Sequence, residues 1–474
     1  MSKLIDTYFK LIKLIGYILP LVLIGLLAFN FIPGLKKKVQ IAAVDKMGEV
    51  GMKRIASNPE AKGSVAAEFI NIPIEAREIS TGIWQATGVG NAHVITTSEK
   101  DILFDTGLAT QVPKQMDALS GAVSDLELSH IIVSHSHADH QGGVKFWHED
   151  GIDIVAHAEF EEEQRYLTEL QSYFWGRNRT LFPFMPESPP AIGLIAYGGV
   201  EPNITVPNGQ PYKFSQGGVD FEVHALPGAE GADNIVLWLP QKKILFAGDF
   251  FGPLFPQFPN IFTMRGEKIR KPVEYIKSLE TIIALGPDMI VPSHKDPITD
   301  KSVIESGLVK MRDATKYVHD KTVEGMNAGK TVDQLMGEIM LPANLVLTQE
   351  HGKVSWAVKS IWEYYATWFH FDKTTELYGV PMKAVYKDIV DAGSELKLQE
   401  RAQSYVNAGE PLKALHLIDI VLGAKPNDAP ALSARKMALG QLLERAETTT
   451  QNSYEIYWLN YRIRETQSKL LDAQ

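Results

Sequence analysis

The sequence predicts an α/β fold, a layered sandwich of strands and helices with a metal site at one edge. Strand-like runs come in two groups, at 74–156 and 219–292, with helical patterns between them. Such an arrangement is typical of layered α/β domains. The apolar run at 131–133 also leads directly into three histidines and one aspartate within six residues. Loops at the ends of strands are where rigid scaffolds carry binding and catalytic side chains.

The N-terminus predicts a single-pass membrane anchor. The 22 residues from Leu14 to Leu35 contain no charged side chain, and as a helix they would span about 33 Å, enough for a hydrocarbon core of about 30 Å. No small-x-small cleavage site follows, which favours an uncleaved anchor over a signal peptide. Lysines flank the run on both sides, so the positive-inside rule does not fix its orientation.

The first half of the following chain reads as strands at 82–85, 93–97, 101–107, 129–134 and 152–156. A helix is expected at 158–172. Residues 176–212 are rich in Pro, Gly and Asn, and long loops of this kind are often functional.

The second half adds strands at 219–223, 234–239, 243–247 and 289–292 and then becomes helical. Apolar residues at helical spacing predict helices at 308–327 and 331–339. A helical hairpin at 394–422 and a helix at 429–447 fit a tetratricopeptide-like pair. We therefore expect three parts: an anchor with linker at 1–70, a catalytic domain at 71–300 and a helical domain at 301–474.

The histidine motif has the spacing of a site for two metal ions. His135 and His137 are two apart and point to one side of an extended chain. Gly142 and Gly143 then allow a turn that swings Asp139 and His140 towards a second position. Imidazole and carboxylate ligands suit zinc, so a His-rich surface turn without metal is the less probable interpretation.

Three later residues are candidates to complete the two metal sites. Glu230, Asp249 and His294 each follow a predicted strand, where loop residues converge. Asp249 is the candidate to bridge the two ions. Taken singly, Glu230 could be a turn carboxylate, Asp249 a cap and His294 a core histidine, and the motif upstream is what favours the metal interpretation.

Composition limits the class of partner. The net charge of −10 and the absence of a basic patch argue against nucleic acid. The chain has no cysteine, which excludes disulfides and cysteine-ligated zinc.

In its candidate metal ligands the chain resembles the metallo-β-lactamase superfamily and, within it, the alkyl sulfatase family. The resemblance rests on the HxHxDH motif, a Pro-Gly-x-Glu turn at 227–230 and the stretch at 260–266. Further likeness lies at 311–320, 351–355 and 368–369, which are similar to the alkyl sulfatase dimerisation segment. The resemblance implies an αββα sandwich followed by an all-α dimerisation region and a homodimer.

The resemblance also assigns roles to individual residues. One metal would be held by His135, His137 and Glu230, and the other by Asp139, His140 and His294, with Asp249 between them. Asn260 and Arg265 would hold the sulfate, so Asp139, Asn260 and Arg265 are the expected catalytic residues. Asp105 is a candidate partner for a ligand histidine, and Trp175, Phe182, Phe184, Phe255 and Phe258 are candidates to line an alkyl slot.

Several features depart from the alkyl sulfatase pattern. The bridging acid is Asp249 where these sulfatases usually carry Glu, and the sequence after His294 differs from the usual His-His-Trp-Pro context. A C-terminal sterol-carrier-like domain, which helps many members hold an alkyl chain, has no counterpart before Gln474. The family is generally secreted, whereas this chain has a predicted anchor.

The expected activity is hydrolysis of alkyl sulfate esters to alcohol and sulfate by a hydroxide on two divalent metal ions, with zinc the expected metal. Zinc lowers the pKa of a bound water to about 7. The alternatives are hydrolysis of another ester, such as a phosphodiester or lactone, and a relative without catalytic activity. The resemblance to the alkyl sulfatases implies that the catalytic domain lies on the periplasmic side of the membrane.

Overall fold

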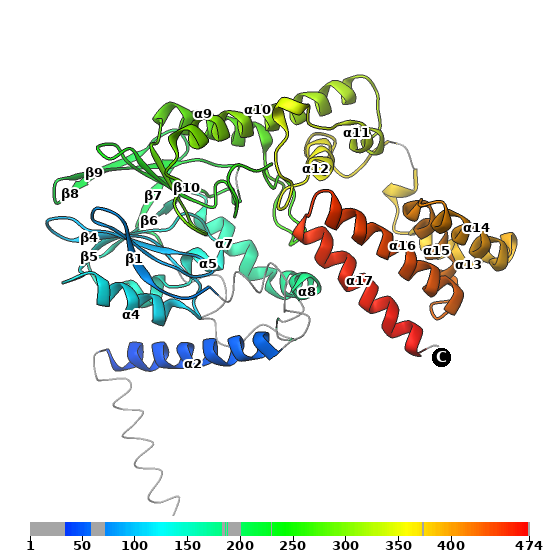
Figure 1. Cartoon of the computed structure of the whole chain (residues 1–474), viewed down its shortest axis with the longest axis horizontal. Coiled ribbons are helices and arrows are strands. Elements are labelled where there is room, and N and C mark those ends of the chain that lie inside the picture. The colour runs from blue at the N-terminus through cyan, green and yellow to red at the C-terminus, as the bar shows by residue number, and fades with distance from the viewer. Residues whose placement is uncertain are drawn as a thin grey trace, which may run out of the picture.

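The computed structural model describes residues 34–57, 72–182, 185, 187, 201–228, 230–371 and 374–472. Two β-sheets pack face to face at one end of the molecule, and helices form the other end (Figure 1). This arrangement confirms the predicted α/β sandwich followed by a helical region. The predicted boundaries of the three domains stay a prediction.

The first sheet has seven strands in the order β1 to β7, which is also their order in the chain. Its members are β1 Ala76–Ser80, β2 Ile83–Ala86, β3 Ala92–Ile95, β4 Asp101–Thr106, β5 Leu128–Ile132, β6 Asp153–His157 and β7 Ile204–Val206. Strands β1 to β4 pair antiparallel and β4 to β7 pair parallel. The parallel part places the ends of β4, β5 and β6 at one edge of the sheet.

The second sheet has five strands in the order β12-β11-β10-β9-β8. They are β8 Tyr212–Gln216, β9 Val219–Ala225, β10 Ile235–Leu239, β11 Ile244–Gly248 and β12 Met289–Pro292. In this sheet only β11 and β12 are parallel neighbours. Their pairing begins with Ile244 opposite Met289. Their ends therefore lie side by side, one residue before Asp249 and two residues before His294.

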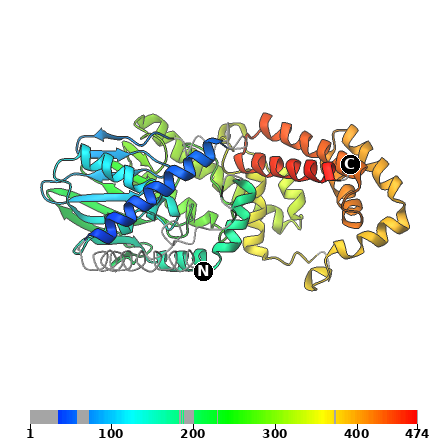
Figure 2. The same ribbon diagram turned by 90° about the horizontal axis from the view of Figure 1, so that it is seen from below.

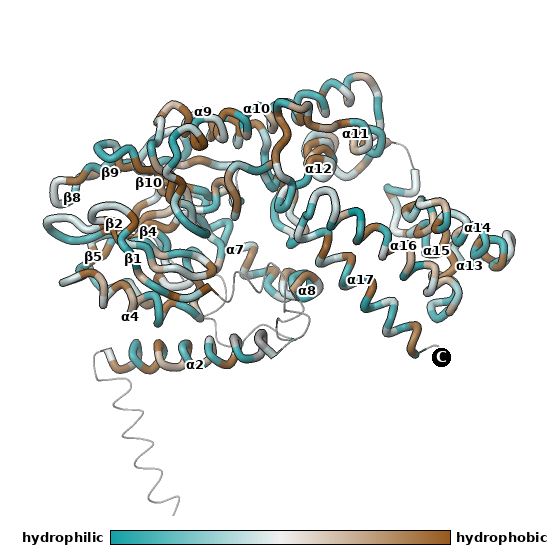
Figure 3. Tube along the Cα trace, in the orientation of Figure 1, coloured by the Kyte–Doolittle hydropathy of each residue, from teal (hydrophilic) through white to brown (hydrophobic). Residues whose placement is uncertain are grey.

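The core between the sheets explains why these runs become strands. Phe104 and Ile132 of the first sheet and Leu237 and Phe246 of the second are fully buried in one cluster. Continuous apolar strands of this kind need both faces covered. The hydrophobic residues of β10 are plain in Figure 3.

Helices cover the outer faces of both sheets. The first sheet is covered by α4 Val112–Ala122, against which α2 Leu35–Ser57 packs through the buried Val44. The second is covered by α9 Pro272–Leu285 and α10 Lys301–Asn327. The predicted helix at 158–172 is two helices, α7 Phe160–Glu169 and α8 Gln171–Leu181, so the expected loop begins later than 176.

The rest of the chain is helical, as expected. It contains α11 Val332–Glu338, α12 Val354–Ala366, α13 Tyr386–Gly393, α14 Glu395–Asn407, α15 Pro411–Ala424, α16 Ala429–Thr448 and α17 Ser453–Asp472, with 3₁₀ turns at Ala343–Leu345, Thr374–Leu377 and Met382–Val385. The α14–α15 hairpin turns at Asn407 and Pro411, as predicted. Helix α17 begins next to α8 and runs along α16 back towards this hairpin (Figures 1 and 2).

Among the described residues, no helix is both long enough and apolar enough to cross a membrane. The span predicted at 14–35 lies outside the described residues except for its last two positions.

Candidate metal centre

The HxHxDH motif follows β5 and continues into two short helices, α5 Ala138–Gln141 and α6 Val144–Trp147. A side-chain carbon added at Gly142 or Gly143 would collide with the backbone after β4. Two glycines therefore let the motif turn sharply against the neighbouring strand, as the sequence predicted.

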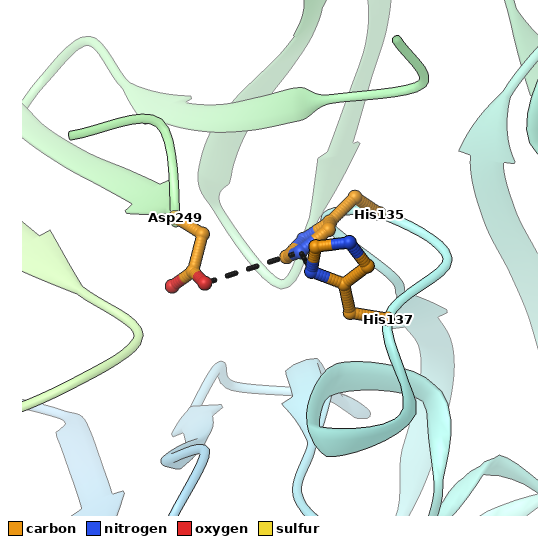
Figure 4. A group of neighbouring side chains, drawn as sticks. All are labelled: His135, His137 and Asp249. Carbon is orange, nitrogen blue, oxygen red and sulfur yellow. Dashed lines mark hydrogen bonds and ion pairs between the residues drawn. The ribbon is translucent and has the colours of Figure 1, made fainter. Parts of the chain in front are cut away.

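Three of the candidate ligands form one group with atoms close enough to hold a metal ion: His135, His137 and Asp249 (Figure 4). The Nε2 atom of His135 lies 2.8 Å from the Nδ1 atom of His137 and 4.0 Å from Asp249 Oδ2. All three side chains are buried, so their facing donor atoms are shielded from solvent.

A second group consists of Asp139, His140 and His294. The His140 Nε2 atom lies 3.5 Å from Asp139 Oδ2, and His294 Nε2 lies 3.7 Å from the same oxygen. Asp249 joins the two groups, because its carboxylate lies 3.4 Å from His140 Nε2 and 3.1 Å from His294 Nε2.

Each histidine of the two groups has one ring nitrogen engaged by an oxygen outside the site. His140 Nδ1 contacts Asp105 at 2.9 Å, and His294 Nδ1 contacts the Val89 carbonyl. A proton on those nitrogens leaves the lone pair of each Nε2 directed into the site.

The other two histidines follow the same rule with different partners. His135 Nδ1 lies 3.0 Å from Ser134 Oγ, which itself donates to Asp105. His137 Nε2 lies 3.3 Å from Glu267 Oε1. All four imidazoles thus direct their other ring nitrogen to the centre. This donor set of nitrogens and carboxylates fits divalent metal ions such as zinc.

The charges of the centre stabilise one another. Burial alone would raise the pKa of Asp249, but His294 and His140 hold it well below its usual value. Burial alone would lower the pKa of His140, but Asp139, Asp249 and Asp105 raise it well above its usual value. The carboxylates are therefore ionised and available to a cation at neutral pH.

The carboxylate of Glu230 faces a different set of partners. Its turn lies against His135, but its oxygens contact His351 Nε2 at 2.8 Å, Arg270 at 2.8 Å and Arg265 at 3.1 Å. Although burial raises the pKa of Glu230, Arg270 and His351 hold it well below its usual value. Glu230 is thus next to the centre but outside both ligand groups.

Of the two residues predicted to bind sulfate, Arg265 lies at the cavity beside the candidate metal site and Asn260 does not. Arg265 lines a cavity of about 760 Å³ that also reaches His137, Asp139, Asp249 and His294. Asn260 does not line it: its Nδ2 atom lies 3.3 Å from His351 Nε2, and its carbonyl accepts a hydrogen bond from Arg270.

The aromatic residues predicted to line an alkyl slot do not all lie at the cavity. Phe182 lines this cavity, whereas Phe258 is fully buried in the core. Phe184 lies outside the described residues.

Sequence reasoning did not find Glu267, Arg270 or His351. Glu267 and Arg270 follow the stretch at 260–266 closely, but nothing in their spacing indicates contact with His137 or Glu230. His351 lies 121 positions from Glu230.

Comparison with known proteins gives two family matches. Residues 86–294 match the metallo-beta-lactamase superfamily, and residues 331–462 match the alkyl sulfatase dimerisation family. A linear primary-alkylsulfatase from a Pseudomonas strain is 28% identical over 59% of this chain. An alkyl/aryl-sulfatase of Saccharomyces cerevisiae is 25% identical over 80% of it.

These alignments span only 56% and 62% of the two relatives. Among solved structures, a stereoselective inverting sec-alkylsulfatase from Pseudomonas sp. superimposes with a TM-score of 0.68 at 19% identity. That alignment covers 82% of this chain and 66% of the other, and it shows that the two share a fold.

Proposed function

Since the chain combines a metallo-beta-lactamase domain with an alkyl sulfatase dimerisation domain, we propose that it is a binuclear metal-dependent hydrolase of alkyl sulfate esters. The products are an alcohol and inorganic sulfate. The observation that carries the proposal is the direction of the four imidazoles, each with one nitrogen engaged outside the centre and the other aimed inward.

The proposed ligands are His135, His137 and Asp249 for one ion and Asp139, His140 and His294 for the other, with Asp249 shared. Glu230 is proposed as a further ligand of the first ion, for which its carboxylate would turn away from His351. Zinc is the proposed metal, since nitrogen and carboxylate donors suit it. When bound, the ions act as Lewis acids and lower the pKa of a water molecule.

The chain's own residues bind and orient the ester. Arg265 reaches the cavity from beside Glu230 and Glu267, and its planar guanidinium matches two sulfate oxygens. Arg270 also pairs with Glu230 and Glu267. These two carboxylates therefore keep a cation beside them when Arg265 turns to the substrate, and negative charge that develops on the leaving sulfate meets Arg265.

A second candidate function is hydrolysis of another ester, a phosphodiester or a lactone. The observation in its favour is Asp249, because an aspartate at the shared position is closer to the wider superfamily than to the alkyl sulfatases. Both functions use the same metal centre, so only the substrate separates them.

The test is to purify the chain, count its metal ions and assay dodecyl sulfate, a phosphodiester and a lactone in parallel. We expect about two ions per chain, hydrolysis of the sulfate ester only and loss of activity on chelation. His135→Ala should lose metal and activity, whereas the surface variant His148→Ala should keep both. A metal-free protein, or preference for either other ester, would overturn the proposal.

We further propose that the protein is a homodimer formed through the helical region, because residues 331–462 match a dimerisation domain. Large apolar side chains are exposed around 368–385, including Trp368, Phe371, Tyr378 and Met382. An apolar patch of this kind is rare on a monomer and typical of an interface.

A further inference from the structure

The cavity at the metal centre is lined by residues that lie far apart in the chain. Besides the metal-site residues, its wall includes Phe182 and Met185 after α8 and Tyr454 and Tyr457 of α17. Phe182 and these tyrosines lie far apart in the chain, yet α17 packs against α8. The last helix therefore completes a cavity that the sandwich alone leaves open.

Polar contacts fix the beginning of α17 in this position. The Asn452 side chain donates to the carbonyls of Gln349 and His351 at 2.9 and 3.2 Å. The Ser453 amide donates to the Glu350 carbonyl at 2.9 Å, and Lys353 pairs with Glu455. These partly buried contacts tie the start of α17 to residues 349–353, so the two segments form one unit.

A chain of contacts leads from the metal centre along this wall. His351 touches Glu230, and its ring lies 5.4 Å from that of Tyr454. Phe182 then meets Tyr454 at 6.5 Å and Tyr457 at 5.7 Å, edge to face in both cases. The wall thus changes from charged groups near the centre to aromatic rings away from it.

We propose that Tyr454 and Tyr457 of α17, with Phe182, form the subsite that receives the alkyl group of the ester and sets the preferred chain length. The inference rests on the proposed function for the identity of the head group. It gives the helical region a direct role in substrate selection, in addition to its proposed role in dimerisation.

Size and chemistry both fit an alkyl group. A cavity of about 760 Å³ falls in the range of pockets that enclose whole organic ligands, and a sulfate group alone would leave most of it empty. Burial raises the pKa of Tyr454 to about 12, so the ring stays uncharged. Aromatic faces of this kind give large apolar contact with little conformational freedom to lose.

The test uses alkyl sulfonates, in which a carbon–sulfur bond replaces the ester and prevents hydrolysis. Binding of butyl, hexyl, octyl and dodecyl sulfonate to the metal-loaded full chain is measured by calorimetry. We expect affinity to rise about threefold to fourfold per methylene while the chain lies on the wall, and then to level off. Tyr457→Ala should reduce this gain for the longer sulfonates at least tenfold, with butyl sulfonate nearly unchanged.

Two further variants separate the subsite from the stability of the helix. Tyr454→Phe keeps the ring and should retain the chain-length dependence. Trp458→Ala removes an exposed aromatic residue of the same helix that does not line the cavity, and it should match the wild type. A flat chain-length series in the wild type, or an equal loss in Trp458→Ala, would overturn the inference.

Failure of the subsite and failure of the hydrolase proposal give different results. If the wild type binds long sulfonates better but hydrolyses no sulfate ester, the subsite stands and the proposed reaction fails. If dodecyl sulfate is hydrolysed but chain length has no effect on binding, the reaction stands and the subsite is wrong.

Discussion

Asp105 Oδ2 lies 2.9 Å from His140 Nδ1, and both side chains are fully buried. The same carboxylate accepts hydrogen bonds from the Ser134 amide and hydroxyl at 2.8 and 2.9 Å and from the Ser293 hydroxyl at 2.9 Å. Ser134 follows β5 and Ser293 follows β12, so one carboxylate ties the ends of both sheets together beside the metal centre.

Asp105→Asn is therefore predicted to weaken metal binding by about 10–100-fold. The residue has a φ of 54°, and asparagine tolerates this conformation, so the backbone need not change. Competition with a chromophoric chelator measures the affinity. Asp101→Asn, at the opposite end of the same strand, is the control and should leave the affinity unchanged; an equal loss there would indicate a general effect on β4.

Glu267→Gln is predicted to lower metal affinity about tenfold, because Glu267 orients His137 and keeps its outer nitrogen protonated. Although burial raises the pKa of Glu267, His137 and Arg265 hold it well below its usual value, so an ionised group is lost. Titration of the apo-protein with zinc provides the measurement. Glu274→Gln, which removes an exposed partner of Lys271, should behave as wild type, and an unchanged affinity in Glu267→Gln would refute the assigned role.

Arg265→Ala is predicted to leave the metal content intact and to reduce turnover of a sulfate ester about 100-fold. Its guanidinium is the one proposed to bind the sulfate, and Lys cannot reproduce its planar geometry. Lys268→Ala removes a cation three residues away that does not line the large cavity, and it should keep near-normal rates. Full activity in Arg265→Ala would remove Arg265 from the sulfate site.

His93 is predicted to make the fold sensitive to acid. The side chain is fully buried against Phe104 and Phe246, and burial lowers its pKa from 6.5 to about 4. The unfolded chain binds a proton at His93 between these values and the folded chain does not, so the free energy of unfolding falls as the pH drops from 6.5 to 4. The loss approaches about 3 kcal/mol.

The variant His93→Leu should lack this part of the acid response. Urea unfolding at pH 7 and pH 4.5 gives the difference in stability for each protein, and the wild type should lose more than the variant. Equal losses would mean that His93 is protonated in the folded state.

Phe371→Glu is predicted to convert the proposed dimer to a monomer, since Phe371 is 88% exposed within the apolar segment and a charge there opposes burial between subunits. Light scattering after gel filtration gives the mass. Leu396→Glu places the same charge on an exposed apolar position of α14 and should leave the dimer intact. A monomeric wild type would contradict the proposal directly.

The α/β sandwich, the helical region and the candidate metal-binding motif could be predicted from the residues alone. Apolar strands and their spacing are local features, and His135, His137, Asp139 and His140 lie so close together that one turn suffices to direct them to a centre. Asp249 and His294 were also predictable, because each follows a buried strand and strand ends gather at one edge.

The groups that hold these candidate ligands in place become apparent only once the chain is folded. Glu267 faces His137, His351 faces Glu230, and Tyr454 closes the cavity from the last helix. None of these pairings leaves a periodic or local pattern, because each depends on how distant elements pack. The physical reason is that strand and turn preferences act over a few residues, whereas the surroundings of a buried charge are set by every element that reaches it.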